Sequence, residues 1–165
     1  MGQQAAKRDD FIQAMRCVAS SVCVVTTDGA AGRHGATVSA FCSVSADPPM
    51  VLVCLNAGSR IAQQVQENGV FRVNILPAGA TGIADRFAGR HDSQVLDRFD
   101  GMPVSGSVPH LDGATSLMCT LSQAVPAGTH QVCIGVVNEV DQGADLPLTY
   151  LAGRYGQISC SESRS

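Results

Sequence analysis

The fold of this chain is decided by the stretch Gly35-Ala-Thr-Val-Ser-Ala-Phe-Cys-Ser-Val-Ser-Ala-Asp-Pro-Pro49. Its hydroxyl side chains, at Thr37, Ser39, Ser43 and Ser45, lie two or four residues apart, so an extended strand would carry them on one face. Small residues beside them would let a large ligand approach the backbone. The Asp-Pro-Pro ends the strand, because proline has no backbone N–H to donate to a β-ladder and it restricts the backbone conformation of the residue before it. A solvated strand face explains the same periodicity, so the rest of the chain has to decide between these interpretations.

Short apolar runs separated by Gly, Pro and Asp predict strands along most of the chain. They are expected at 22–27, 34–44, 50–56, 70–76, 115–125, 130–142, 148–151 and 154–158. Helices are expected at 9–19, with Phe11, Met15 and Val18 on one face, and at 60–68 and 80–87. The polar segment 88–110 is expected to be a loop with a short helix at 94–99. Because strands dominate and β-α-β alternation is not sustained, the sequence favours an antiparallel barrel over a doubly wound sheet.

Composition points to one packed domain with few surface charges. The chain has 165 residues, of which 45% are hydrophobic and only 15% charged. So few charges suggest that part of the surface is buried against another subunit. The net charge of −3 and the lack of a Lys/Arg run argue against binding to nucleic acid or to an anionic membrane.

The expected location is the cytoplasm. The polar start of the chain resembles no signal peptide, and no apolar run approaches the length of about 18 residues that a membrane helix needs. Seven cysteines without a C-x-x-C pair predict reduced thiols and no metal site. Cys23, Cys54, Cys119 and Cys133 are expected to be small buried hydrophobes, and Cys160 an exposed thiol. We expect a domain at 9–158 between flexible ends at 1–8 and 159–165.

Six segments, in order, resemble the short-chain flavin reductases, which are the reductase partners of two-component flavin monooxygenases. The resemblance covers residues 11–158, and the segments are 22–27, 35–49, 51–59, Phe71-Arg-Val-Asn-Ile-Leu76, Ala127-Gly-Thr-His130 with its following strand, and 146–155 with Gly153-Arg-Tyr155. It implies a mainly β fold, a split antiparallel β-barrel with a few short helices. It also implies a homodimer with the flavin at or near the subunit interface.

A flavin needs donors for the polar edge of its ring and for its phosphate, which hydroxyls and turn N–H groups can supply. For the ring and ribityl chain we expect Thr37, Val38, Ser39 and Ala40. Around the phosphate we expect Ser43, Asn56, Ser59 and Arg60, the last three because they open a helix. Phe71 and Asn74 are expected to border the ring, and Phe87 to contact an adenine if the flavin is FAD. Phe71 has an equally good alternative as a core residue.

His130 is the candidate catalytic residue, because the resemblance places a histidine there beside the nicotinamide. Its expected role is to orient the nicotinamide or a flavin edge, since hydride transfer needs no proton abstraction. Thr129 replaces the aspartate usual in the family at that position. The resemblance also implies that Arg154 and Tyr155 help to close the site on the side where the nicotinamide binds. The remaining histidines, at 34, 91 and 110, are expected to be solvated.

The resemblance implies an NAD(P)H:flavin oxidoreductase. Hydride would pass from nicotinamide C4 to flavin N5 across about 3–3.5 Å, and the reduced FMN or FAD would then leave to supply a partner monooxygenase. The sequence does not distinguish FMN from FAD. NADH is favoured over NADPH, because the sequence has no obvious basic cluster that would bind the 2′-phosphate of NADPH. One alternative is a non-catalytic flavin-binding or electron-transfer module. Another is a pyridoxamine-phosphate-oxidase-like barrel, whose phosphate sites carry more Arg and Lys. No Gly-x-Gly-x-x-Gly or Gly-x-Ser-x-Gly motif supports a Rossmann site or a hydrolase.

Overall fold

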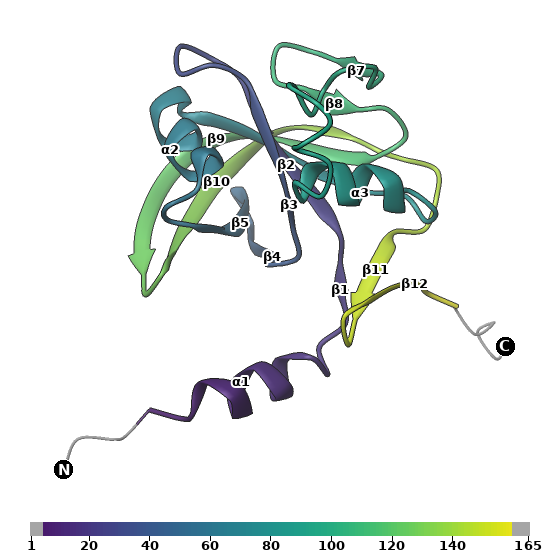
Figure 1. Ribbon diagram of the computed structural model, residues 1–165. Coiled ribbons are helices and arrows are strands. Elements are labelled where there is room, and N and C mark those ends of the chain that lie inside the picture. The colour runs from purple at the N-terminus through teal and green to yellow at the C-terminus, as the bar shows by residue number, and fades with distance from the viewer. Residues whose placement is uncertain (1–4, 160–165) are drawn as a thin grey trace, which may run out of the picture.

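The computed structural model describes residues 5–159 and has a β-rich body from which one helix and a small sheet project (Figure 1). The helices are α1 (Arg8–Met15), α2 (Arg60–Asn68) and α3 (Thr81–Phe87). The body's main sheet contains β2 (Cys23–Thr27), β3 (His34–Val38), β4 (Phe41–Ala46), β5 (Pro49–Asn56), β6 (Val70–Ile75), β9 (Thr115–Ala127) and β10 (His130–Asp141). A second sheet contains β1 (Ser20–Ser21), β11 (Leu148–Leu151) and β12 (Arg154–Gln157), and a third contains β7 (Val104–Ser105) and β8 (His110–Leu111).

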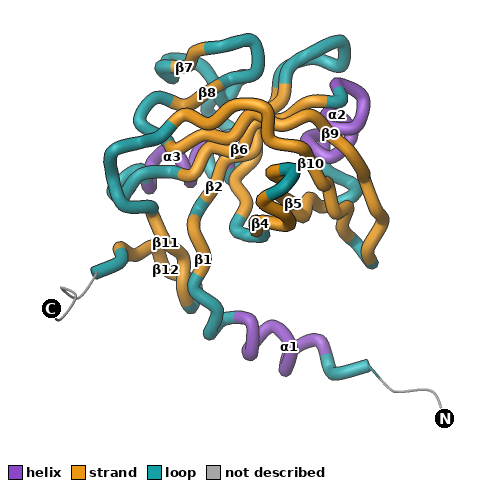
Figure 2. The backbone as a smooth tube through the Cα atoms, turned by 180° about the vertical axis from the view of Figure 1, so that it is seen from behind, coloured by secondary structure: helices purple, strands orange, loops and turns teal. Residues whose placement is uncertain are grey.

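The main sheet curls so that its two edges meet. Its antiparallel strands run in the order β3-β2-β6-β9-β10-β5-β4, so β3 and β4 are the two edge strands. Yet only Ser39 and Ala40 connect them, and so short a link spans at most about 10 Å. At the seam, the Cys54 N–H donates to the Ala40 carbonyl at 3.0 Å. The predicted split antiparallel barrel is therefore confirmed (Figure 2).

The predicted single strand at 34–44 is wrong, because the chain crosses the seam at Ser39 and Ala40. Its hydroxyls therefore do not share one face. Thr37 donates inward to the Ala84 carbonyl at 2.7 Å, whereas the Ser45 hydroxyl accepts from the Asp47 N–H at 3.2 Å. The register of β4 on β5 also shifts between residues 43 and 45.

Two apolar clusters fill the body, one beneath α2 and one beneath α3. In the first, the fully buried Phe71 occupies the space beside Gly135, where an added Cβ would lie 2.6 Å from the ring. In the second, Phe87 packs edge-on against Phe99 with ring centroids 5.0 Å apart. Gly35 permits that packing, since a Cβ there would lie 2.7 Å from Phe87. Both clusters support the strands that border the seam.

Helix α2 begins and ends where the sequence predicts. The Ser59 hydroxyl accepts from the Ala62 N–H at 3.4 Å as the N-cap, and Gly69 ends the helix with a φ of 70°. Its apolar side chains Ile61 and Val65 are buried against the barrel. This local agreement of cap, apolar spacing and glycine stop explains why the prediction succeeds.

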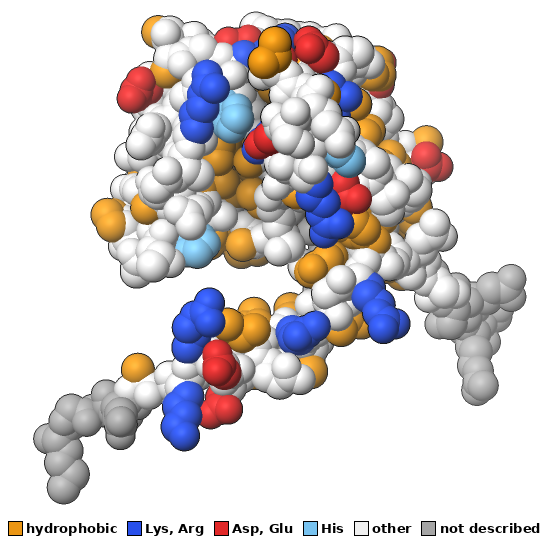
Figure 3. All heavy atoms as spheres, in the orientation of Figure 1, with side chains coloured by type: hydrophobic (Ala, Val, Ile, Leu, Met, Phe, Trp, Pro, Cys, Tyr) orange, Lys and Arg blue, Asp and Glu red, His pale blue; other side chains and the backbone are white. Residues whose placement is uncertain are grey.

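Helix α1 differs from its prediction. It spans Arg8–Met15 instead of 9–19, its N-cap is Lys7, and none of its residues is buried. Phe11 is 60% exposed and Met15 48% exposed. The space-filling view shows the helix standing away from the body with apolar side chains on its surface (Figure 3). The apolar face that the sequence predicts is present, but it has no partner within the described residues.

The segment 88–110 contains no helix at 94–99, so that prediction is wrong. The described structure there consists of turns and the β7–β8 hairpin, and Arg98 ties the turns before residue 98 to the end of α3 and to β3. Its guanidinium donates to the Gly35 carbonyl at 3.0 Å, to the Phe87 carbonyl at 2.9 Å and to Asp92 at 2.6 Å. The segment is therefore held by the bonds of one arginine, including one to the distant Gly35, and not by the local periodicity of a helix.

The cysteine prediction is confirmed for Cys23, Cys119 and Cys133, which are buried free thiols, whereas Cys54 is half-buried. Cys160 lies outside the described residues. Burial raises the pKa of the Cys23 thiol to about 12. Within residues 5–159, no helix is long and apolar enough to cross a membrane. The same residues contain no cluster of three metal-ligating side chains.

Candidate active site

A cleft of about 310 Å³ opens at the seam and brings together seven of the predicted residues. We call it the seam cleft. The predicted residues that line the cleft are Thr37, Val38, Ser39, Ala40, Asn56, Ser59 and His130. These residues come from the end of β3, the β3–β4 link, the end of β5, the α2 N-cap and the start of β10. The closing of the barrel thus assembles residues that are far apart in sequence.

One end of the seam cleft is formed by the turn that leads from β5 into α2. The Asn56 side chain accepts from the Gly58 N–H at 3.0 Å, and the Ser59 hydroxyl donates to the Asn56 carbonyl at 2.6 Å. These bonds hold the first turn of α2 toward the cleft. The first N–H groups of a helix lack intrahelical acceptors, and they carry partial positive charge that suits an anion. This end can therefore receive a phosphate.

His130 lies beside that turn, at the start of β10. Cross-strand pairing places it opposite Asn56 on β5 and opposite Ala127 on β9. Its side chain is exposed, and the Thr129 hydroxyl lies 3.0 Å from its Nδ1 atom. The backbone of His130 is therefore held by strands on both sides while its ring remains accessible at the cleft.

A smaller hollow of about 180 Å³ adjoins the seam cleft and shares Thr37, Val38 and Ser39 with it. Tyr155 and Arg90 line its other side. The Tyr155 hydroxyl donates to Asp85 at 2.8 Å, and burial together with this bond raises the pKa of the phenol. The structure thus places Tyr155 close to the predicted flavin contacts.

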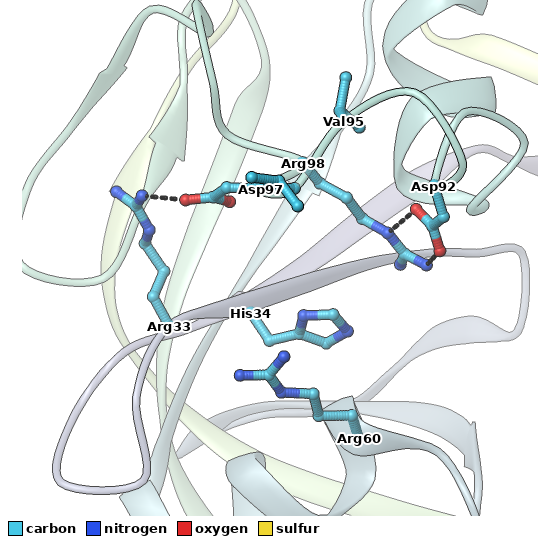
Figure 4. A pocket seen from close by; sticks show the side chains of 8 residues that line it. Arg33, His34, Arg60, Asp92, Val95, Asp97 and Arg98 are labelled. Atoms are coloured by element: carbon cyan, nitrogen blue, oxygen red, sulfur yellow. Dashed lines mark hydrogen bonds and ion pairs between the residues drawn. The ribbon is translucent and has the colours of Figure 1, made fainter.

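A third cleft, of about 550 Å³, continues from the α2 N-terminus and is rich in cationic side chains. We call it the arginine cleft. It is lined by Arg33, His34, Arg60, Asp92, Val95, Leu96, Asp97 and Arg98. Figure 4 shows Arg33 paired with Asp97, Arg98 paired with Asp92, and the Arg60 guanidinium beside the His34 ring. Among the described residues, Arg60 has no acidic partner, which leaves its charge available to a ligand.

His34 is half-buried in the arginine cleft, which corrects the prediction that it is solvated. Burial and the neighbouring guanidinium groups of Arg98 and Arg60 lower its pKa to about 4. The ring is therefore neutral at physiological pH. His110 is also half-buried, in β8, with Nε2 3.2 Å from the Ala114 carbonyl, whereas His91 is exposed as predicted.

Three predicted flavin contacts are instead core residues. Phe71, Asn74 and Phe87 have no exposed surface in the chain. The Asn74 amide donates to the Val24 carbonyl at 3.1 Å and accepts from the Leu111 N–H at 3.0 Å. Its polar atoms are occupied in joining strands. In the described chain these three side chains therefore offer no surface to a flavin ring or an adenine.

Two further candidates lie outside the clefts just described. Ser43 is exposed on β4, beyond the β3–β4 link, and Arg154 is exposed on β12. Sequence reasoning also missed Asp85, which holds Tyr155, and Arg98, which holds the loop over the arginine cleft. The bond from Arg98 to the Gly35 carbonyl joins segments 63 residues apart, so no local motif signals it.

A fused-ring ligand with a phosphate tail fits this arrangement. The seam cleft offers small residues, neutral hydroxyls and a histidine for a planar polar ring, and the α2 turn with Arg60 offers a site for the phosphate. Fold and site together define a flavin-binding split barrel.

Comparison with known proteins agrees with this description. The model of the flavin reductase like domain matches residues 15–159, and the chain belongs to this family. Among curated relatives, the FMN reductase (NADH) RutF of Variovorax paradoxus (strain S110) is 38% identical over 156 residues, covering 91% of this chain and 85% of the relative. The corresponding protein of Cronobacter sakazakii is 39% identical, covering 96% of this chain and 95% of the relative.

Solved structures of proteins named as flavin reductases or as an NADH:FAD oxidoreductase share the fold. The flavin reductase PheA2 aligns with a TM-score of 0.85 and 29% identity, covering 94% of this chain and all of PheA2 (100%). The NADH:FAD oxidoreductase SgcE6 of Streptomyces globisporus C-1027, solved with NAD and FAD fragments, aligns with a TM-score of 0.85 and 25% identity over 98% of this chain and 100% of its own. BorF is the flavin reductase component of a bacterial two-component tryptophan halogenase. It aligns with a TM-score of 0.83 and 27% identity, covering 94% of this chain and 100% of BorF.

Proposed function

We propose that this chain is an NADH-dependent flavin reductase that transfers hydride from NADH to FMN or FAD and releases the reduced flavin. The proposal rests on the seam cleft, which is lined by His130, by Thr37 and Ser39 at the end of β3 and in the β3–β4 link, and by Ser59 at the N-terminus of α2. Membership of the flavin reductase like domain family and the naming of the relatives as FMN reductases (NADH) support the same reaction.

In the proposed complex, the polar edge of the flavin lies along residues 37–40, and its phosphate lies at Ser59 and Arg60. The reacting face of the ring is left open toward His130 and Tyr155. Flavin supplies the electron chemistry, and the protein supplies binding, orientation and an open face for the nicotinamide. His130 holds a polar group of the nicotinamide or of the flavin edge and does not remove a proton.

The site suits an exchangeable flavin. Most groups along the seam cleft are neutral, and the phosphate end has one guanidinium without an acidic partner among the described residues. The reduced flavin would then reach a separate oxygenase. Structural neighbours that are reductase components of a halogenase and of the styrene monooxygenase system support a partner of that class.

We further propose that the chain acts as a homodimer. An apolar cleft of about 800 Å³ lies between α1 and the body, and it shares Ser39, Ala40 and Cys54 with the seam cleft. Apolar residues on α1 that remain exposed in the single chain would be covered by a second copy. Such a contact would complete the wall of the flavin site next to the β3–β4 link. Light scattering of the purified protein tests this, with the mass of one chain as the contradicting result.

Steady-state oxidation of NADH, followed by its near-ultraviolet absorbance with FMN or FAD added in turn, tests the proposed reaction. Turnover that depends on added flavin is expected, and His130→Ala should lower kcat/KM for NADH about a hundredfold if His130 supports the transition state. Protein that binds flavin but turns over with neither NADH nor NADPH would instead be a non-catalytic flavin-binding module.

A further inference from the structure

We propose that the arginine cleft is a second ligand subsite, which binds the adenosine phosphate half of a dinucleotide, FAD or NADH. The choice of dinucleotides rests on the proposed function, whereas the subsite itself does not. The cleft measures about 550 Å³, which is larger than the seam cleft of about 310 Å³ and within the usual size of small-molecule sites. Arg60 lines the arginine cleft and its neighbour Ser59 lines the seam cleft, so the two clefts meet at the α2 N-terminus.

The charges of the arginine cleft favour an anion, because three guanidinium groups face two carboxylates. A guanidinium nitrogen of Arg33 lies 2.6 Å from Asp97, and one of Arg98 lies 2.6 Å from Asp92, so each carboxylate is neutralised by one arginine. Arg60 is the third arginine, and within residues 5–159 no carboxylate pairs with it. The whole chain has a net charge of −3, so this local surplus is opposite in sign to that of the molecule. A phosphate group supplies the missing partner.

Two of the three guanidinium groups are held in place by the protein. The guanidinium carbon of Arg33 lies 4.7 Å from the centroid of the Phe99 ring. Arg98 donates to the Gly35 carbonyl at 3.0 Å and to the Phe87 carbonyl at 2.9 Å. Side chains that are already ordered lose little freedom when a ligand binds. The cleft is therefore a built feature of the fold.

Planar and apolar side chains in the same cleft suit a base. Figure 4 shows the His34 ring beside the Arg60 guanidinium, and Val95 and Leu96 add apolar surface. Histidine rings and guanidinium planes both stack on nucleobases. Because burial and the neighbouring arginines lower the pKa of His34 to about 4, its ring is neutral and can stack without adding charge. A simple anion would use only the guanidinium groups, whereas an adenosine phosphate uses these and the planar and apolar surfaces.

Calorimetric titration of the full-length protein with AMP tests the subsite without requiring turnover. AMP should bind more tightly than inorganic phosphate, and added salt should weaken it. Leu96→Asp brings a negative charge to the cleft at a fully exposed side chain, so the fold should tolerate it, and AMP should bind about threefold to fivefold more weakly.

Two control variants isolate the charge and its position. Leu96→Asn is the uncharged counterpart, and Leu146→Asp places the same charge on an exposed leucine that lines none of the clefts described above. Both should bind AMP like the native protein. Failure of AMP to bind, or equal AMP affinity in Leu96→Asp and the native protein, would overturn the proposal. Inorganic phosphate that binds as tightly as AMP would also overturn it, because the cleft would then be a simple anion site.

Steady-state kinetics distinguish the two dinucleotides. If FAD supplies the adenosine phosphate, Leu96→Asp should raise KM for FAD about threefold to fivefold and change KM for FMN much less. If NADH supplies it, the same substitution should raise KM for NADH with either flavin. Native KM values for both FAD and NADH in Leu96→Asp contradict the proposal. If Leu96→Asp weakens AMP binding but the native protein oxidises NADH with neither flavin, the subsite stands and the proposed reductase function fails.

Discussion

The phenolic hydroxyl of Tyr155 on β12 donates a 2.8 Å hydrogen bond to the carboxylate of Asp85 on α3. The same carboxylate lies 3.3 Å from the guanidinium of Arg90. One residue earlier on α3, the Ala84 carbonyl accepts from Thr37 at 2.7 Å. Helix α3 therefore joins β12 of the small sheet to β3 of the barrel, and it holds Tyr155 at the hollow beside the seam cleft.

Replacing Tyr155 by Phe should lower the free energy of unfolding by up to about 1 kcal/mol at neutral pH, because one partly solvated hydrogen bond is lost. The raised pKa of Tyr155 means that its contribution is present below the ordinary value of 10.0 and is lost as pH rises through the higher folded value. Urea unfolding at neutral and alkaline pH measures both effects. Tyr150→Phe, which alters the neighbouring ring 5.6 Å away, is the control. Equal stability of Tyr155→Phe and the native protein would refute this.

His34 should make the fold less stable in mild acid. Its pKa falls from 6.5 in the unfolded chain to about 4 in the folded protein, so only the unfolded chain takes up a proton between these values. The contribution of neutral His34 to the free energy of unfolding is therefore fully present above pH 6.5, and it declines as pH falls toward 4. His34→Gln should flatten this decline in thermal melts, whereas His91→Gln, at an exposed histidine, should not. An identical decline in His34→Gln and the native protein would contradict this assignment.

Gly135 should not tolerate a side chain. An alanine Cβ there would lie 2.6 Å from Phe71 and 2.9 Å from Cys119, both fully buried. The expected loss of stability is about 1–3 kcal/mol, the usual cost of overpacking a core. Gly82→Ala on α3 is the matched substitution, since its added Cβ meets nothing within 4 Å and should stabilise the helix slightly. Equal melting temperatures for the two variants would contradict this account of the core.

Arg60 should distinguish flavins by their phosphate. Arg60→Gln removes the guanidinium beside the α2 N-terminus, and loss of a charged hydrogen bond to a phosphate should weaken FMN binding about tenfold or more. Riboflavin, which has the ring but no phosphate, should bind both proteins equally. Arg154→Gln is the control at an exposed arginine outside the clefts. Equal weakening of FMN and riboflavin would place the ring, and not the phosphate, at Arg60.

The sequence predicts best where local signals agree. The cap and glycine stop of α2, the antiparallel barrel and the gathering of residues 37–40 with His130 all follow from short motifs in order. It fails where distant parts of the chain decide. The break at Ser39 depends on the closing of the sheet, and Phe71 and Asn74 are buried by partners that no local pattern names. The α1 face is apolar as predicted, but periodicity cannot say what covers it.

The most direct test of hydride transfer is to mix NADH with the flavin-loaded protein under anaerobic conditions and follow the visible absorbance of the oxidised flavin. The account predicts rapid bleaching, a much slower rate in His130→Ala with unchanged flavin affinity, and return of the absorbance when oxygen is admitted. Flavin that stays oxidised in the native protein with a saturating amount of NADH would contradict the account, and would leave the chain a flavin-binding protein without reductase activity.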